Sequence, residues 1–591
     1  MLPPSVAALL RHALHQVLRS PSALLRRVLL VAAPLSVVLT IYLYLFPVFS
    51  GCGFPLPLEA DGSTPSASAA FWETAKLHYP GSKQQLPQPP SANASASGND
   101  TDAEAGSTTP LPERPILPAH MPLRNAPFRL LALGDPQLEG DSSIPNTFTT
   151  SLFPHIGKVW RDATFQTTHY SLRWRIRQIV HDLIDIFFLD FFNNIESVRK
   201  RIDLLGNDFY LAHIYRTVHW WTQPTHVTVL GDLLGSQWVD DAEFDRRADR
   251  FWDRDVLGGS LQSHACMMAD NVTEGAAATI FDADANPSSD RLPPELRIVV
   301  LNSMNLDTPA NSTELQDATY TFINSVINTA SAVEYLGHFT LVLTHVPLHK
   351  PEGVCVDSPL FEFHDHDGSL REQNMLSADA SKGFLEGILG MSGDTMAPAN
   401  GRGRRGVILN GHDHEGCDTY HFINQTQGNS HVDRSWESRR WAEAPVGRPG
   451  HPGVREITVR SMMGDFGGNA GLLSAWFDEQ AWEWRFEYAT CPLGRQHLWW
   501  FVHIMDLLVV VATVAYPFVA LWESLSAAPA SAPTDTKIPA AKVNGASANG
   551  HVATDKTVKE PKIKMEEEER NGHALAPRMT RSSLSRSPSV G

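Results

Sequence analysis

The chain has 591 residues, of which 42% are hydrophobic and 19% are charged, a composition that is ordinary for a folded protein and excludes disorder throughout. Its formal net charge of -17 argues against a broad basic face for nucleic acid. At this length the chain can hold one large domain or two ordinary ones, with tails left over.

The first predicted element is a membrane span at residues 28–49, an apolar run of 22 residues without a charge. A cleaved signal peptide is the alternative, but the apolar core is too long for one and no convincing small-residue cleavage site ends it. Residues 1–27 carry no acidic residue and four arginines, Arg11, Arg19, Arg26 and Arg27. We therefore predict an uncleaved anchor with a cytoplasmic amino-terminal segment.

Residues 50–124 are predicted to form a lumenal low-complexity tether. The stretch from about Asp61 to Pro118 is rich in Ser, Ala, Pro, Thr and Gly. Such a composition cannot bury enough apolar surface to fold.

Residues 125–497 are predicted to form the folded domain. Short apolar runs recur there, each ending in a polar or glycine-bearing turn: FRLLALG, HVTVLG, RIVVLN, FTLVLT, GVILN and REITVRS. Between them, residues 171–219 carry apolar positions at roughly helical spacing. Strands that alternate with helices indicate an α/β domain.

A second apolar run predicts another span at residues 498–522, with Trp499 and Trp500 as interfacial anchors and Asp506 inside it. Residues 523–591 are predicted to be a disordered cytoplasmic tail. All five cysteines and the sequons at Asn93, Asn99, Asn271, Asn311 and Asn424 fall between the two spans. These features favour a lumenal domain with both termini cytoplasmic.

Residues of the types that bind metals follow four of the strands. FRLLALG leads into Asp135 and Gln137, HVTVLG into Asp232, FTLVLT into His345, and GVILN into the GHDH motif of His412 and His414. Open α/β sheets place their sites at the carboxyl ends of strands, so we expect these side chains to converge.

Carboxylate and imidazole ligands suit a borderline divalent ion such as Mn²⁺, Zn²⁺ or Fe²⁺, whereas a structural zinc site would use a cysteine quartet. His412 and His414 are separated by one residue and project to the same side of an extended segment, so each can serve a different ion of a pair. Two ions about 3.5–4 Å apart can share a carboxylate and activate a hydroxide. One aspartate is then common to both ions.

The order GDPQ, GDLLGSQW, THVPLH, GHDH resembles that of the calcineurin-like metallophosphoesterase superfamily, in which helices flank a sandwich of two mixed β-sheets. With a span at each end and SMMGDFGGNAG near the end of the domain, the chain looks most like the fungal and animal endoplasmic-reticulum enzymes that remove ethanolamine phosphate from the mannose of GPI anchors. The likeness covers nearly all of residues 120–522.

The resemblance implies a role for each ligand. Asp135, Gln137, Asp232 and His414 would hold the first metal, and His345 and His412 would hold the second, with Asp232 bridging the two. Gln137 stands where the superfamily more often has histidine, and an amide oxygen favours a hard ion, so Mn²⁺ is preferred over Zn²⁺ or Fe²⁺. The catalytic set, acting through the metals, would be Asp232, His345 and His412.

One motif of the superfamily is missing. An Asn-His pair, usually GNHD or GNHE, should lie between Asp232 and His345, where the Asn binds the second metal and the His assists phosphate chemistry. The interval from Phe251 to Val300 has no such motif. His264 and Asn271 are weak substitutes, and the segment was lost through a faulty gene model or a real deletion.

Two functions follow from the sequence. The first is a phosphodiesterase of the endoplasmic-reticulum membrane, with the Golgi as an alternative location, that acts on GPI glycolipid or GPI-anchored proteins and supports their export. The second is a catalytically impaired membrane protein of the same fold that acts with cargo receptors in transport from the endoplasmic reticulum to the Golgi. Nucleic acid is not an expected partner of either.

The cysteines leave two interpretations open. Cys355 and Cys417 each follow a ligand motif, and Cys52 and Cys491 each lie beside a span, so two disulfides can form and leave Cys266 over. Free, unpaired thiols are the alternative.

Overall fold

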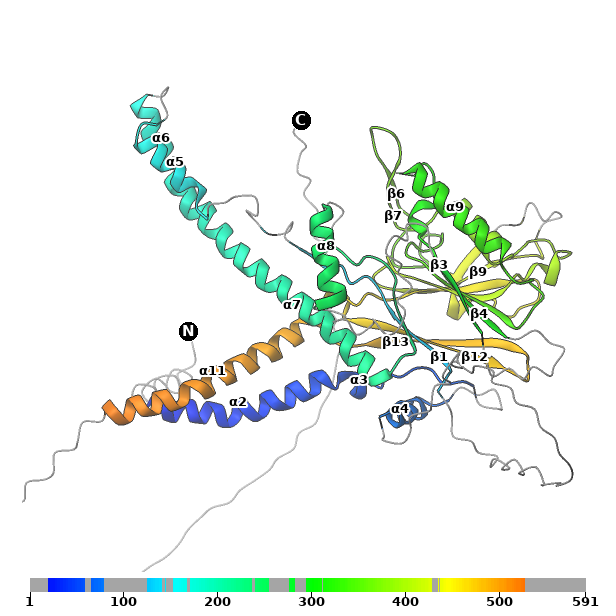
Figure 1. Cartoon of the computed structure of the whole chain (residues 1–591), viewed down its shortest axis with the longest axis horizontal. Coiled ribbons are helices and arrows are strands. Elements are labelled where there is room, and N and C mark those ends of the chain that lie inside the picture. Colours follow the sequence, from blue (N-terminus) through cyan, green and yellow to red (C-terminus); the bar gives the residue numbers. More distant parts are fainter. Residues whose placement is uncertain are drawn as a thin grey trace, which may run out of the picture. The chain divides into compact units, whose positions relative to one another are not determined.

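The computed structural model describes residues 20–58, 65–78, 125–140, 144, 152–166, 171–235, 240–254, 276–281, 294–310, 312–427, 434 and 436–526. The described residues form a mixed α/β structure with two large sheets and an apolar helix near each end (Figure 1). This confirms the predicted α/β class. The assignment to the metallophosphoesterase type of sandwich stays a prediction.

The larger sheet has a parallel centre, β4, β5, β8 and β11, and antiparallel edges. Its order is β10 (Trp436–Arg440), β9 (Cys417–Ile423), β11 (Gly453–Thr458), β8 (Arg405–Asn410), β5 (His338–Leu343), β4 (Glu295–Val300) and β3 (Ala276–Phe281).

The smaller sheet pairs β1 with β2 in parallel and carries two antiparallel strands beyond β1. Its order is β13 (Glu483–Pro492), β12 (Asn469–Asp478), β1 (Phe128–Leu133) and β2 (His226–Val229). A separate hairpin pairs β6 (Phe361–Phe363) with β7 (Leu370–Gln373).

The two large sheets share one hydrophobic core, because alternate residues of a strand point to opposite faces. From β1, Leu130 and Ala132 enter this shared core, which also takes Leu341 from β5 and Val407 from β8. The intervening Leu131 points to the other face. The central layer of the domain is therefore sheet against sheet.

Helices cover the outer faces of both sheets. Residues of α7 pack on the smaller sheet, and residues of α9 and α10 pack on the larger one. The helices of the domain are α5 (Pro154–Ala163), α6 (Leu172–Asp185), α7 (Phe191–Thr222), α8 (Asp241–Asp249), α9 (Thr313–Asn328) and α10 (Ala378–Ile388). Serine caps begin α6, α9 and α10, where Ser171, Ser312 and Ser377 accept hydrogen bonds from backbone amides.

Two helices are long and apolar enough to cross a membrane, α2 (Pro21–Tyr44) and α11 (Gln496–Ser526). They lie in place of the predicted spans 28–49 and 498–522, and the short α3 (Phe46–Phe49) takes up the end of the first. The two helices contact each other at Asp506, the charged residue inside the second predicted span, which is half-buried. It accepts hydrogen bonds from Ser36 and, at 2.8 Å, from Thr40.

The interval predicted as a tether is partly structured. Phe54 and Leu56 are buried, and α4 (Ala67–Lys76) begins at the cap Ser66, so residues 50–58 and 65–78 differ from a featureless linker. The composition argument missed them because their apolar residues are few but anchored beside Cys52. Most of the remaining tether lies outside the described residues.

Both disulfides considered from the sequence are present. Cys52 is bonded to Cys491 and ties the end of the first apolar helix to β13. Cys355 is bonded to Cys417 across 62 residues of sequence. Cys266, the sequons at Asn93, Asn99, Asn271 and Asn311, residues 1–19 and the tail beyond residue 526 lie outside the described residues.

Candidate functional site

The four predicted ligand loops meet at the carboxyl ends of their strands. The backbone amide of Gln137 donates to the carbonyl of Asp232 at 2.8 Å, which joins the loops after β1 and β2. The amide of Gly411 donates to the carbonyl of His345 at 3.2 Å, which joins the loops after β5 and β8. Across the two sheets, the amide of His412 donates to Asp135 Oδ1 at 2.9 Å.

These side chains form two clusters that share one residue. One ligand atom from each of Asp232, His345 and His412 lies within 4.8 Å of the others. The same holds for Asp135, Asp232 and His414. The structure thus brings together the two sets that the sequence predicted, with Asp232 in both; their occupation by metal stays a prediction.

Unusual backbone conformations aim these side chains. Asp135, Gln137, Asp232 and His412 have φ values of 44°, 44°, 46° and 72°. Residues other than glycine rarely adopt this left-handed region, and each instance costs about 1–3 kcal/mol. Such strain tends to gather at functional sites, and here it coincides with four of the six predicted ligands.

Two glycines allow the loops to approach closely. A Cβ atom on Gly411 would lie 2.7 Å from Asp135 Oδ1, and one on Gly231 would lie 2.3 Å from His345 Nδ1. Side chains at either position would push the ligand loops apart.

Hydrogen bonds orient two of the imidazoles. His345 Nδ1 donates to the carbonyl of Leu230 at 2.8 Å, so Nε2 is the nitrogen that faces Asp232 Oδ1, at 3.4 Å. His412 Nε2 lies 2.8 Å from the carbonyl of Gln373, and its buried Nδ1 has no partner. Metal-binding histidines commonly donate their second N–H in this way, which leaves the other nitrogen as a ligand.

Asp135 is the most buried member of the site. Its side chain is fully inaccessible, and its Oδ2 has no hydrogen-bond partner. Burial raises the pKa of Asp135 to about 7, against the opposing effect of His345. A buried carboxylate with a vacant oxygen is costly unless a cation compensates it, so Asp135 fits a metal ligand.

Asp232 is more accessible, with 35% of its side chain exposed. Burial alone would raise its pKa, but the hydrogen bonds from His345 and Gln137 and the nearby imidazoles together lower it to about 2. The same pairing with Asp232 raises the pKa of His345 against the effect of burial. Asp232 is therefore an anion at neutral pH, as a residue shared by two cations must be.

Gln137 lies inside the first cluster. Its amide nitrogen is 2.9 Å from Asp232 Oδ2 and 3.2 Å from His414 Nε2. Amide oxygen and nitrogen are exchanged by a half-turn of the side chain. If a cation lay between Asp232 and His414, the side-chain oxygen of Gln137 could take the place of its nitrogen and face the cation. Gln137 therefore suits the ligand position that the sequence predicted.

No family model matches the chain. Over 396 residues it is 30% identical to Protein TED1 of Saccharomyces cerevisiae, an alignment that covers 53% of this chain and 77% of the yeast protein. The chain belongs to the TED1 family.

A second relative lies in fission yeast. An uncharacterized protein of Schizosaccharomyces pombe is 26% identical over 316 residues, which covers 46% of this TED1-family chain and 63% of the relative.

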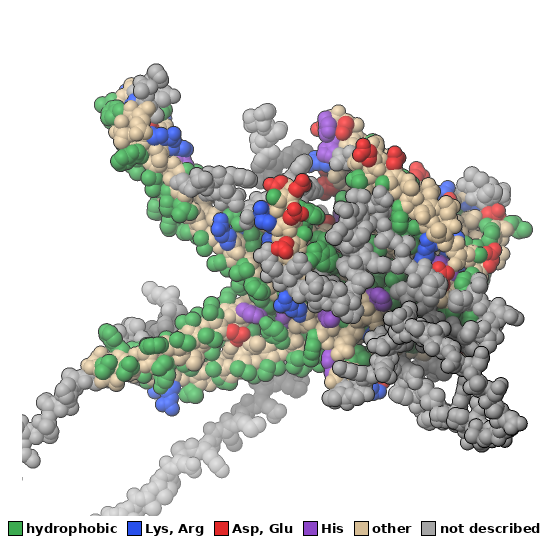
Figure 2. Space-filling model, viewed as in Figure 1, with side chains coloured by type: hydrophobic (Ala, Val, Ile, Leu, Met, Phe, Trp, Pro, Cys, Tyr) green, Lys and Arg blue, Asp and Glu red, His purple; other side chains and the backbone are tan. Residues whose placement is uncertain are grey.

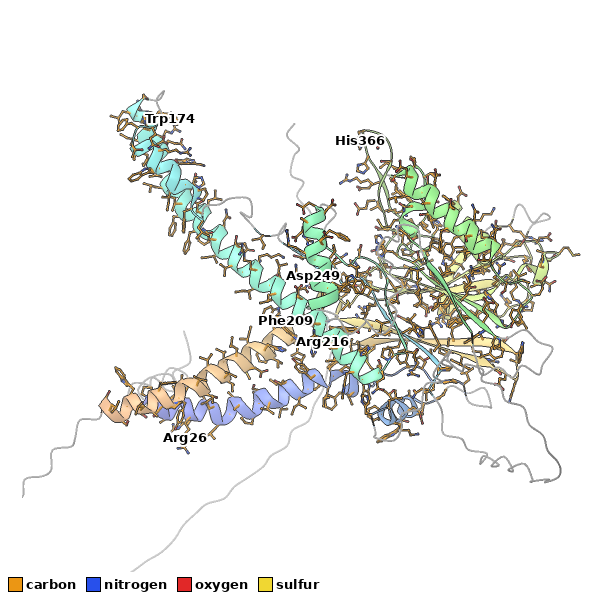
Figure 3. All side chains as sticks on the ribbon, viewed as in Figure 1. Arg26, Trp174, Phe209, Arg216, Asp249 and His366 are labelled. Atoms are coloured by element: carbon orange, nitrogen blue, oxygen red, sulfur yellow. A yellow bond between two sulfur atoms is a disulfide. The ribbon has the colours of Figure 1, made fainter. Side chains whose placement is uncertain are left out.

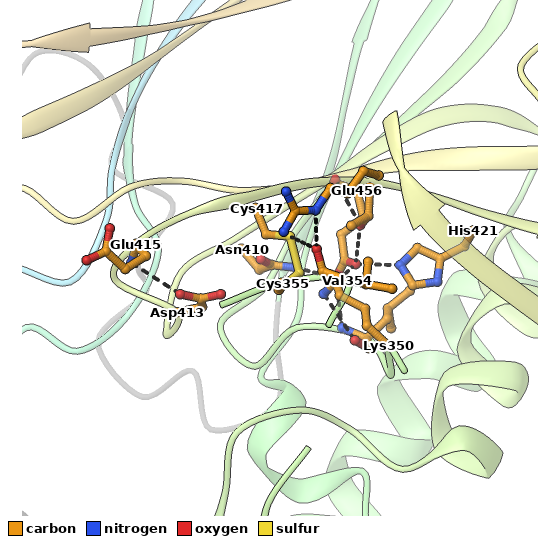
Figure 4. Close-up of a disulfide and its surroundings, with 12 residues drawn as sticks. Lys350, Val354, Cys355, Asn410, Asp413, Glu415, Cys417, His421 and Glu456 are labelled. Carbon is orange, nitrogen blue, oxygen red and sulfur yellow. Dashed lines mark hydrogen bonds and ion pairs between the residues drawn. A yellow bond between two sulfur atoms is a disulfide. The ribbon is translucent and has the colours of Figure 1, made fainter. Parts of the chain in front are cut away.

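A buried ion network supports two of the ligand loops in this TED1-family chain, and sequence reasoning missed it. Glu456 of β11 is fully buried and pairs with Lys350 at 2.8 Å and with His421 (Figure 4). It also accepts hydrogen bonds from the amide of Leu348, after His345, and from Asn410, before His412. The available signal was a glutamate inside the apolar run REITV.

The Cys355–Cys417 disulfide lies in the same region (Figure 4). Arg440 donates a hydrogen bond to the carbonyl of Val354 at 2.7 Å, next to the disulfide. The disulfide joins the segment after His345 to the start of β9, just after His414. The disulfide therefore links the two histidine-bearing loops at points beyond the histidines in sequence and restrains both loops.

A cleft of about 1430 Å³ opens over the two clusters. Asp232, His345, His412 and His414 line its floor, and Lys200, Leu204 and Asn207 of α7 line one wall. Gln496, the first residue of the apolar helix α11, also lines the cleft. The site is thus open to a ligand near the start of that helix.

The interval expected to hold the Asn-His motif stays largely outside the described residues. Of residues 255–293 only the backbone of β3 is described, so neither His264 nor Asn271 can be placed. Within the described part of the chain, the second cluster of histidine and carboxylate side chains consists of Asp232, His345 and His412.

Proposed function

We propose that this chain acts in the early secretory pathway, in export from the endoplasmic reticulum to the Golgi, as a membrane-anchored protein with a lumenal metallophosphoesterase-type domain. The two apolar helices, the membership of the TED1 family and the mixed sheets support the proposal. Both termini would then be cytoplasmic, as the arginines before the first span suggest.

The site geometry best supports a dinuclear phosphodiesterase. The observation that carries this proposal is the pair of ligand clusters that share Asp232. Asp135, Gln137, Asp232 and His414 would hold one ion, and Asp232, His345 and His412 the other. When bound, two such ions supply a hydroxide nucleophile and stabilise charge on phosphate oxygens.

The donor set fits this use. His412 Nδ1 and Asp135 Oδ2 are buried without a partner, which is costly unless a cation binds there. Carboxylate, imidazole and amide ligands together favour Mn²⁺, with Zn²⁺ or Fe²⁺ as alternatives. Leu230 and Gln373, through their carbonyls, would hold the imidazoles in the orientation that presents these nitrogens.

The substrate we propose is ethanolamine phosphate on the mannose of a GPI anchor. The resemblance of the motifs points to this substrate, and the cleft supports it, because Gln496 at the start of α11 lines the same cleft as the ligands. A site next to a membrane helix meets a lipid-anchored substrate at raised effective concentration.

Metal content and hydrolysis test this proposal together. The full chain in detergent should bind two Mn²⁺ per chain and cleave a model phosphodiester, and Asp232→Asn should abolish both. The matched control is His366→Ala. His366 lies in HDHDG, residues 364–368, which carries another His-x-His pair but belongs to neither cluster, and its side chain is 74% exposed (Figure 3). Full activity in Asp232→Asn would refute the proposed site.

A second candidate is a catalytically impaired partner protein in the same transport step, acting with cargo receptors. It is favoured by the missing Asn-His motif between Asp232 and His345. The relationship to TED1 fits it better than a hydrolase, because the name of that relative carries no reaction. Binding of one Mn²⁺ without hydrolysis, together with defective export in cells lacking the chain, would support it.

A further inference from the structure

The helical arm, which we define as α5, α6, the π-helical turn Ile186–Asp190 and α7 as far as Leu205, has an inverted polarity. Among its described residues, 152–166 and 171–205, every buried residue is ionisable: His155, Asp162, Arg175, Asp182 and Asp190. His155 Nδ1 lies 2.8 Å from Asp190, and Gln178 donates to Asp182 at 3.1 Å. The interior of the arm is thus polar.

The outside of the arm is apolar. From α6 through α7, hydrophobic residues recur at steps of three or four and form one stripe. Representative members have exposed fractions between 44% and 58%: Ile176, Phe187, Phe191, Ile195, Ile202 and Phe209. Figure 2 shows hydrophobic side chains over this arm as over α2 and α11, and Figure 3 shows Trp174 projecting near the tip of the arm.

A helix hairpin in water buries apolar residues and exposes polar ones. The arm does the reverse, and its stripe is a contiguous apolar surface of the kind that marks an interaction site. Helices that face lipid adopt this arrangement, with ionisable residues packed inside and apolar residues outside.

The stripe runs into the junction with the apolar helices. Its last member, Phe209, lines a cavity of about 600 Å³ together with Tyr44 of α2 and Trp499 of α11. Nearby, Gln496 donates to Asn207 at 3.4 Å, and Trp500 packs against Gly206, where a Cβ atom would lie 1.7 Å from the indole. Tryptophans favour the boundary between lipid and water, so the stripe is continuous with a surface suited to that boundary.

The charges of the arm fit the same environment. Its charged residues of the exposed class are all basic: Lys158, Arg161, Arg173, Arg177, Arg199 and Arg201. Of these, Arg199 is paired with Glu196, whose side chain is 46% exposed. Its acidic residues are buried or half-buried. Basic side chains beside an apolar stripe are typical of helices that lie in a membrane interface, where the side chains reach the lipid headgroups.

We propose that the helical arm lies in the lumenal membrane interface, with its apolar stripe at the acyl boundary and its basic residues among the headgroups. The occupant of the stripe is the lipid bilayer that α2 and α11 cross. Lys200, Leu204 and Asn207 of α7 line the cleft that opens over the two clusters. With the arm in this position, the mouth of that cleft lies next to the membrane surface.

Single-cysteine labelling in nanodiscs tests the proposal. The background is Cys266→Ser, since the other four cysteines are in disulfides. Val198→Cys places an NBD fluorophore on the stripe, and Asn324→Cys places one on the exposed side of α9 as the matched control. Nanodiscs each hold one full-length chain in phosphatidylcholine, with or without phosphatidylserine.

The label at residue 198 should be several-fold less accessible to aqueous iodide than the label at residue 324, and lipids with a nitroxide on the acyl chain should quench it. Iodide quenching equal to that of the control would overturn the proposal. Shielding from iodide without quenching by the nitroxide lipid would also overturn it, because the stripe would then be covered by protein. Unchanged thermal unfolding of both variants excludes misfolding as the cause.

Discussion

Replacing Lys350 by methionine should destabilise the domain by about 3–5 kcal/mol, because breaking a buried ion pair leaves an uncompensated charge. Lys350 and Glu456 are 1% and 0% exposed, so water cannot replace the lost partner. Glu456 retains His421 and the amide of Leu348, which keeps the expected loss below that of an isolated buried carboxylate.

The pH dependence of this loss follows from the pKa of Glu456. Burial alone would raise it, but Lys350 and His421 lower it below its usual value. A carboxyl group with a lowered pKa stabilises the fold above its unfolded pKa of about 4.3 and loses that contribution as the pH falls. The difference between wild type and Lys350→Met should therefore be largest at neutral pH and shrink in acid, where Glu456 can be protonated.

Thermal unfolding in nanodiscs measures the effect, with an expected decrease in Tm of roughly 4–6 °C for a domain of this size. Lys382→Met, which removes an exposed lysine from α10, is the matched control. Adding Glu456→Gln to Lys350→Met should recover part of the loss, because both charges are then gone. Equal Tm values for Lys350→Met and wild type at neutral pH would refute the account of a buried pair.

Three further predictions concern the site. Gly411→Ala should lower Mn²⁺ affinity in calorimetry by displacing Asp135, whereas Gly383→Ala, which meets nothing within 4 Å, should not. Mn²⁺ affinity should fall as the pH drops below about 7, since Asp135 must lose its proton to bind a cation. The metal-free protein should instead become more stable as the pH drops through the same range, because the folded state then holds the proton on Asp135. An Mn²⁺ affinity that does not change with pH would contradict this prediction. Replacing Cys355 and Cys417 by serine should cost about 4 kcal/mol in denaturant unfolding for a 62-residue separation, and no loss would mean that the disulfide is dispensable.

The sequence was informative about the site because each ligand is fixed by a local pattern. Asp135 follows the mostly buried β1 and Asp232 follows the half-buried β2. Since these strands are parallel neighbours, the loops that follow them lie side by side. His345 follows β5 and His412 follows β8. These strands are also parallel neighbours, so the loops that carry the two histidines lie side by side as well. Local patterns therefore placed the ligand-type residues at strand ends, and the resemblance to the superfamily supplied their division between two ions.

What the sequence did not reveal depends on contacts between distant segments. Glu456 becomes a support of the ligand loops only when β11 lies beside β8, a pairing that no local pattern specifies. Residues 171–219 were predicted to be helical from their period, but period alone does not say whether the apolar face meets protein or lipid. The burial of ionisable residues such as Asp182 and Asp190 is what favours lipid over protein as the partner of the apolar face.

The site lies between the two sheets, so the placement of its residues relative to one another depends on the whole domain. Asp135 and Asp232 extend from the smaller sheet, while His345, His412 and His414 extend from the larger one. Each cluster therefore draws ligands from both sheets, and their separation is set by the shared core between them. Because protein interiors are close-packed, a change in that core, which includes Leu230 beside His345, moves one set of predicted ligands relative to the other.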